Sequence, residues 1–115
     1  MRKAIVALSI LFAVAAQAQT AKIVGHGAST CADFNQEIQG NPALEREFFA
    51  WAQGFMSGAL MRAPQGVDED IDLLPDALPA AEQMKFVQEM CLRNTGQDYM
   101  DAVRALYHQL RDLRK

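Results

Sequence analysis

Cys31 and Cys91 are the two cysteines of the chain, and they are the residues whose chemistry the sequence defines best. They lack the CxxC spacing and the adjacent histidines that metal-binding or redox pairs use. An even number of cysteines is typical of disulfide bonding in an oxidising compartment, and here a single pairing exists. A Cys31–Cys91 disulfide encloses 59 residues. Closing a loop of that size stabilises a fold by about 4 kcal/mol on the chain-entropy model.

The two histidines are the first candidates for acid–base chemistry. His26 lies between Gly25 and Gly27, a flexible setting that holds a ligand or a general base poorly, so we expect it to be solvated. His108 falls on the water-facing side of its predicted helix. The chain has no serine in a nucleophile elbow, no glycine-rich phosphate loop and no HExxH motif. We therefore predict no catalytic residue, no cofactor and a protein that is not an enzyme.

Three aspartates, Asp68, Asp70 and Asp72, alternate as the first ligands of a calcium-binding loop do. Such a loop also requires a glycine and a glutamate at the positions that Leu73 and Pro79 occupy in this chain. We therefore predict no metal site, and we interpret the three aspartates as a solvated acidic turn.

Residues 1–18 have the pattern of a secretory signal peptide. Arg2 and Lys3 form a positive start, the apolar run over residues 5–16 follows, and a small-x-small site ends at Ala18. This apolar run is too short for a comfortable membrane span. We expect cleavage near Ala18 and a location in the periplasm or outside the cell.

Cleavage leaves 97 residues and changes the formal net charge from −3 to −5. A chain of this length forms one small domain. Its acidic balance makes nucleic acid a poor partner, because neutralising phosphates requires a basic surface. We predict a flexible leader over residues 19–29 and a single helical domain over residues 30–115.

The stretch from Pro42 to Arg62 predicts a long central helix. Its apolar side chains cover about half of the helical circumference, which is wider than the stripe of a surface helix. We expect its aromatic residues to lie in the core of the folded protein. The apolar positions are Leu44, Phe48, Phe49, Trp51, Ala52, Phe55, Met56, Ala59 and Leu60.

Small residues occupy much of the remaining face of this helix, namely Ala50, Gly54, Ser57 and Gly58. A glycine inside a helix costs about 0.5–1 kcal/mol relative to alanine, so two glycines four residues apart indicate a purpose. We favour close helix packing, in which another backbone approaches Gly54 and Gly58. The alternative is a binding groove.

Three further helices flank the central one. Ser29 or Thr30 opens the first, and Thr30-x-x-Asp33 resembles a capping box. Gly40 ends this helix, and Asn41 caps the central helix ahead of Pro42. After a loop that holds one short helical turn, a helix runs from about residue 79 to 93. The last helix, over residues 97–113, has an apolar seam. The predicted fold is all-α, a small orthogonal bundle of four to five helices stapled by one disulfide.

The ends of the mature chain carry a resemblance to the HdeA family of periplasmic acid-stress chaperones. The matching residues are Thr30-Cys31-Ala32-Asp33-Phe34, then Cys91, Tyr99, Asp101, Val103 and Tyr107. The resemblance implies a homodimer at neutral pH that loosens in acid and exposes an apolar surface to unfolded clients. It also implies a disulfide between the first and third helices. Our candidate client or partner surface consists of Phe48, Trp51, Phe55 and Met56.

The middle of the chain is more similar to another group. Trp51 to Gly58 has the pattern WxxGFxSG of small secreted proteins that resemble the immunity proteins against type VI secretion amidase effectors. That resemblance implies a protein that binds one specific periplasmic enzyme in its native state. Both functions need a protein partner, and neither needs a cofactor, a nucleic acid or a membrane.

Overall fold

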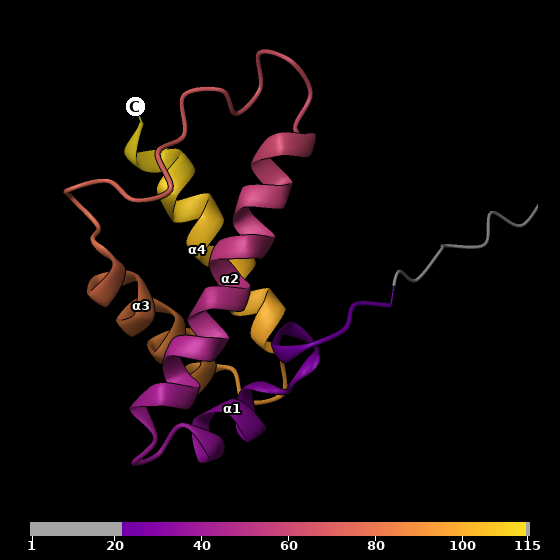
Figure 1. The fold of residues 1–115 in the computed structure, drawn as a ribbon, viewed down its shortest axis with the longest axis vertical. Helices are drawn as coiled ribbons and strands as arrows, with labels where there is room; N and C mark the ends of the chain where they lie inside the picture. The colour runs from indigo at the N-terminus through magenta and orange to yellow at the C-terminus, as the bar shows by residue number, and fades with distance from the viewer. Residues whose placement is uncertain (1–21, 115) are drawn as a thin grey trace, which may run out of the picture.

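The computed structural model describes residues 22–114, and the expected signal peptide over residues 1–18 lies outside them. The described chain contains no strand, so the predicted all-α class is confirmed. It forms one short 3-10 helix and four α-helices (Figure 1): η1 (His26–Ala28), α1 (Cys31–Glu37), α2 (Pro42–Arg62), α3 (Ala80–Arg93) and α4 (Tyr99–Leu113).

Helix α2 is the longest element, and α4 crosses it (Figure 1). Helix α3 packs against α1 and α4, and η1 packs against α2 and α4. Residues 63–79 join α2 to α3 through turns and bends, where we had expected a short helical turn. None of the helices within residues 22–114 is long and apolar enough to cross a membrane.

The predicted helix caps are present at the starts of α1 and α2. The Thr30 hydroxyl accepts a hydrogen bond from the backbone N–H of Asp33 at 3.1 Å. The Asn41 side-chain carbonyl accepts one from the N–H of Leu44 at 3.2 Å, directly before Pro42. These bonds satisfy N–H groups that have no partner within the first helical turn.

Helix α4 begins two residues later than the sequence predicted, at Tyr99, because Asp98 and Asp101 form a capping box. The Asp101 carboxylate accepts a hydrogen bond from the N–H of Asp98 at 3.1 Å, and the Asp98 side chain accepts one from the N–H of Asp101. The expected seam on this helix is buried at Tyr99, Val103, Leu106 and Leu110, whereas Leu113 is 41 % exposed.

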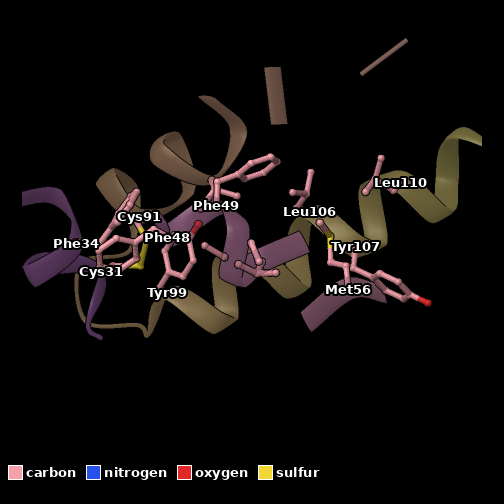
Figure 2. Packing of buried hydrophobic residues seen from close by; sticks show 14 of the residues in the cluster. Cys31, Phe34, Phe48, Phe49, Met56, Cys91, Tyr99, Leu106, Tyr107 and Leu110 are labelled. Carbon is pink, nitrogen blue, oxygen red and sulfur yellow. A yellow bond between two sulfur atoms is a disulfide. The ribbon is translucent and has the colours of Figure 1, made fainter. Parts of the chain in front are cut away.

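The disulfide between Cys31 and Cys91 joins α1 to α3, as predicted, and both cysteines are buried. Three aromatic rings pack beside it, from Phe34 on α1, Phe48 on α2 and Tyr99 on α4 (Figure 2). Their ring centroids lie 4.7–5.0 Å apart in all three pairs. We call this part of the core, Cys31, Cys91, Phe34, Phe48 and Tyr99, the disulfide end.

The other part of the core lies where α2 and α4 pass beneath the loop over residues 63–79. Figure 2 shows Met56, Leu106, Tyr107 and Leu110 there, away from the disulfide. The loop adds Ile71, which is 6 % exposed. We call this part, Met56, Ile71, Leu106, Tyr107 and Leu110, the loop end.

The second half of the loop is attached to α3 by a buried neutral side chain. The Gln83 side-chain amide donates hydrogen bonds to the backbone carbonyls of Leu73 and Leu78, both at 2.9 Å. Gln83 is fully buried, and Leu73 and Leu78 pack against the core. Because an amide does not titrate, this attachment is independent of pH.

Within the described residues, packing on the bundle begins at residue 25, inside the stretch 19–29 that the sequence predicts as a flexible leader. The Ser29 carbonyl accepts a hydrogen bond from the N–H of Tyr99 at 2.8 Å. Gly27 is buried, and the ring of His26 lies 4.2 Å from that of Phe48, centroid to centroid. Residues 25–29 are therefore part of the bundle, and His26 is half-buried against an aromatic ring instead of solvated.

Candidate functional site

The four residues of the predicted client surface divide into two pairs in the folded chain. Phe48 and Met56 are fully buried. Trp51 and Phe55 are half-buried and stack on each other, with ring centroids 5.2 Å apart and an angle of 17° between the rings. Only the Trp51–Phe55 pair is therefore accessible while the protein is folded.

The N-terminal segment covers one side of Trp51. The indole N–H donates a hydrogen bond to the carbonyl of Val24 at 3.3 Å. A Cβ atom on Gly27 would lie 1.9 Å from the six-membered ring of Trp51, so only glycine leaves room for the indole at this position. The sequence pattern around His26 had indicated flexibility, and it gave no signal for this contact because Trp51 lies 24 residues further along the chain.

The predicted close packing on Gly54 and Gly58 is wrong within the described chain. Both glycines are exposed, and no atom lies within 4 Å of the position that a Cβ would take on either. Helix α2 buries its other side, through Phe48, Ala52 and Met56, against the rest of the bundle. The binding-groove alternative for this face stays a prediction.

A buried carboxylate fastens the first half of the loop to α4. Asp68 is 4 % exposed and accepts a hydrogen bond from the Tyr107 hydroxyl at 2.9 Å. The Arg111 guanidinium donates to both carboxylate oxygens, each at 3.1 Å. Arg114 lies 3.6 Å from the carboxylate and donates to the carbonyl of Val67 at 2.9 Å. We call Asp68, Tyr107, Arg111 and Arg114 the Asp68 cluster.

This geometry corrects the interpretation of the acidic stretch as a solvated turn. Asp70 and Asp72 are exposed, as expected. Asp68, which precedes them on the loop, is buried. A carboxylate tolerates burial when charged donors surround it, and the bidentate bond from Arg111 is the strongest arrangement available. Asp68 and Arg111 are 43 residues apart, so no local pattern could have paired them.

The environment of Asp68 favours its charged form. Hydrogen bonds from Arg111 lower the pKa of Asp68 below its ordinary value of 3.8, with a further contribution from Tyr107, and burial only partly opposes them. The same hydrogen bond raises the pKa of Arg111. Burial, and then the bond to Asp68, raises the pKa of the Tyr107 phenol, which therefore remains a donor.

Residues 22–114 contain no group of three or more His, Cys, Asp or Glu side chains that could hold a metal ion. His108 is exposed, as expected, and its ring nitrogen lies 3.1 Å from Arg111. We take the loop end of the core as the candidate site. It is an apolar surface that is buried in the folded protein, and the Asp68 cluster attaches the adjoining loop to α4.

Comparisons of the chain with protein-family models, with curated proteins and with solved structures found no match.

Proposed function

We propose that this chain is an exported, HdeA-like acid-stress chaperone that binds unfolded clients through apolar surface uncovered at low pH. The observation that carries the proposal is the burial of Asp68, a residue of the loop over residues 63–79, between Tyr107, Arg111 and Arg114. A carboxylate at this position makes the cover of the loop end depend on pH.

The direction of the pKa shift determines whether acid strengthens or weakens the Asp68 cluster. The pKa of Asp68 is lower in the folded protein than in an unfolded chain. The cluster therefore stabilises the fold fully above the unfolded value of about 3.9, and this contribution is lost as the pH falls through the lower, folded value. Protonated Asp68 no longer attracts Arg111 and Arg114, which repel each other. Acid thus releases the loop.

Release of the loop exposes side chains that suit an unfolded client. Ile71 leaves the core together with Asp68, and the buried cluster that contains Met56, Leu106 and Leu110 loses a member. Methionine adapts its shape to varied partners, which favours binding without sequence specificity. The disulfide between α1 and α3 does not titrate, so the opened chain keeps part of its structure.

A client-protection assay tests the proposal. The purified mature protein is mixed with an acid-denatured client, and aggregation is followed by light scattering at pH 2–3 and at pH 7. We expect suppression of aggregation in acid and none at pH 7. Equal protection at both values, or none at either, contradicts the proposed function.

A second function, specific inhibition of one periplasmic enzyme, has its own supporting observation. The exposed face of α2 from Ala50 to Met61 carries no charge, and Met61 on it is 85 % exposed. The stacked Trp51–Phe55 pair lies on the same helix, and tryptophan is enriched at energetically important interface positions. Capture of a single stoichiometric partner from a periplasmic extract at pH 7 favours this function over the first.

A further inference from the structure

A second site is indicated by a hollow of about 290 Å³ between α1, the first turn of α2 and α3. It lies apart from the Asp68 cluster and from the exposed face of α2. Two of its residues are apolar, three carry side-chain amides and one is acidic; they are Asn35, Ile38, Gln39, Glu45, Gln88 and Leu92. Its volume is at the lower end of that of small-molecule sites.

Glu45 gives the hollow a negative charge that the described chain does not neutralise. No lysine, arginine or histidine nitrogen within residues 22–114 forms an ion pair with it. Its side chain accepts a hydrogen bond from the side-chain amide of Gln88. The charge of Glu45 also contributes, after burial, to the raised pKa of the Tyr99 phenol.

Two of the neighbouring amides have a fixed orientation, because each already donates one hydrogen bond to a partner within the chain. Gln88 must direct its nitrogen at Glu45, since a carboxylate only accepts hydrogen bonds. Asn35 directs its nitrogen at the carbonyl of Cys91, at 3.1 Å, for the same reason. The carbonyl oxygens of both amides remain as acceptors beside the carboxylate.

The carboxylate of Glu45 and the two oriented amide oxygens favour a cation with several N–H groups. A primary ammonium has three such donors. Ile38 and Leu92 supply apolar contacts for a short chain of methylene groups, and Leu92 is 66 % exposed at the rim. We propose that this hollow binds an alkylammonium group, presented either by a lysine side chain of a partner protein or by a free alkylamine. This site does not depend on the proposed chaperone function.

NMR of the isotope-labelled mature protein at pH 7, during titration with n-butylammonium, tests the proposal. We expect n-butylammonium to shift the amide signals of residues 35, 38, 88 and 92 in a saturable manner, and uncharged n-butanol to leave them unchanged. Glu45→Gln should weaken n-butylammonium binding about tenfold or more, as expected for a lost charged hydrogen bond. Glu47→Gln is the matched control, because Glu47 lies on the same helix with its side chain 67 % exposed.

A second variant keeps the test decisive if Glu45→Gln unfolds. Leu92→Ser changes an exposed residue, and it should reduce the preference for n-butylammonium over methylammonium. Binding of lysine with blocked termini identifies a protein side chain as the ligand, and binding of the free amine alone identifies a small molecule. Equal binding of n-butanol, or wild-type affinity in folded Glu45→Gln, overturns the proposal.

Discussion

The disulfide end and the loop end of the core are held together by different physical means. At the disulfide end, a covalent bond and three packed aromatic rings join α1, α2, α3 and α4, and no ion pair links these five side chains. The titratable groups near them are His26, whose ring packs on Phe48, and Glu45, whose charge acts on Tyr99. At the loop end, a carboxylate among two arginines and a tyrosine fastens a loop that has no helix of its own. We therefore expect acid to weaken the loop end more than the disulfide end.

This difference indicates how a small domain can release one segment in acid while the rest of its fold stays together. A uniform core would unfold as one unit, whereas a core with one titratable cover can expose part of its apolar surface while the remainder stays joined. The predictions below test the division at one end or the other, beginning with the largest expected effect.

Phe48→Ala tests the disulfide end. Phe48 is fully buried between the rings of Phe34 and Tyr99, and its truncation leaves a cavity. We expect the free energy of unfolding to fall by about 3–5 kcal/mol, with nearly the same loss at pH 7 and at pH 4. Denaturant unfolding at both values measures it. A loss confined to one pH contradicts the assignment of this end as insensitive to acid.

Asp68→Asn tests the loop end. Loss of the carboxylate leaves Arg111 and Arg114 without their partner, so stability at pH 7 should fall, by less than in Phe48→Ala. Because the wild-type cluster loses its contribution as the pH falls through the lowered pKa of Asp68, the difference in stability between the two proteins should shrink in acid. Thermal unfolding from pH 2 to pH 7 measures this convergence.

Asp70→Asn is the matched control for Asp68→Asn, since Asp70 lies two residues away on the same loop and is exposed. It should follow the wild-type pH dependence. If both variants show the same profile, the acid sensitivity comes from the general charge of the loop and the Asp68 cluster is not its source.

Gly27→Ala tests the attachment of the N-terminal segment. The added methyl group would collide with the ring of Trp51, so the segment or the indole must move. We expect destabilisation of about 1–3 kcal/mol, typical of overpacking. A melting temperature at or above that of the wild type would show that residues 25–29 do not pack on α2 in solution.

Gly58→Ala gives the smallest effect and the opposite sign. Nothing lies near the added methyl group, and alanine favours a helix over glycine by about 0.5–1 kcal/mol. Thermal unfolding of dilute protein should therefore show a gain. A loss that grows with protein concentration would instead place this face in contact with a second molecule.

Local patterns in the sequence predicted the helices and the disulfide. Thr30 and Asn41 act on N–H groups three residues away, and the seam on α4 repeats within one helix, so neighbouring residues carry the information. The disulfide followed because Cys31 had a single candidate partner. The capping box at Asp98 and Asp101 has the same local signal, and it places the start of the helix at Tyr99 instead of at Gln97.

The arrangement of these elements in space was harder to predict. Helical periodicity places Gly54 and Gly58 on one face of α2, but it does not say which face a neighbour covers. It likewise cannot show that Asp68 meets Arg111, or that Trp51 meets Gly27, because those contacts depend on how distant segments fold back. The candidate site consists mainly of contacts of this kind.

The bond between the indole of Trp51 and the carbonyl of Val24 has a practical consequence. Trp51 is the only tryptophan of the chain, so its fluorescence has a single source, an indole that the N-terminal segment contacts. Detachment of the segment would place the indole in water and shift its emission to longer wavelength. An acid titration that records this emission beside far-ultraviolet circular dichroism would therefore give the order of events. It would tell whether the segment leaves α2 before the helices melt or together with them.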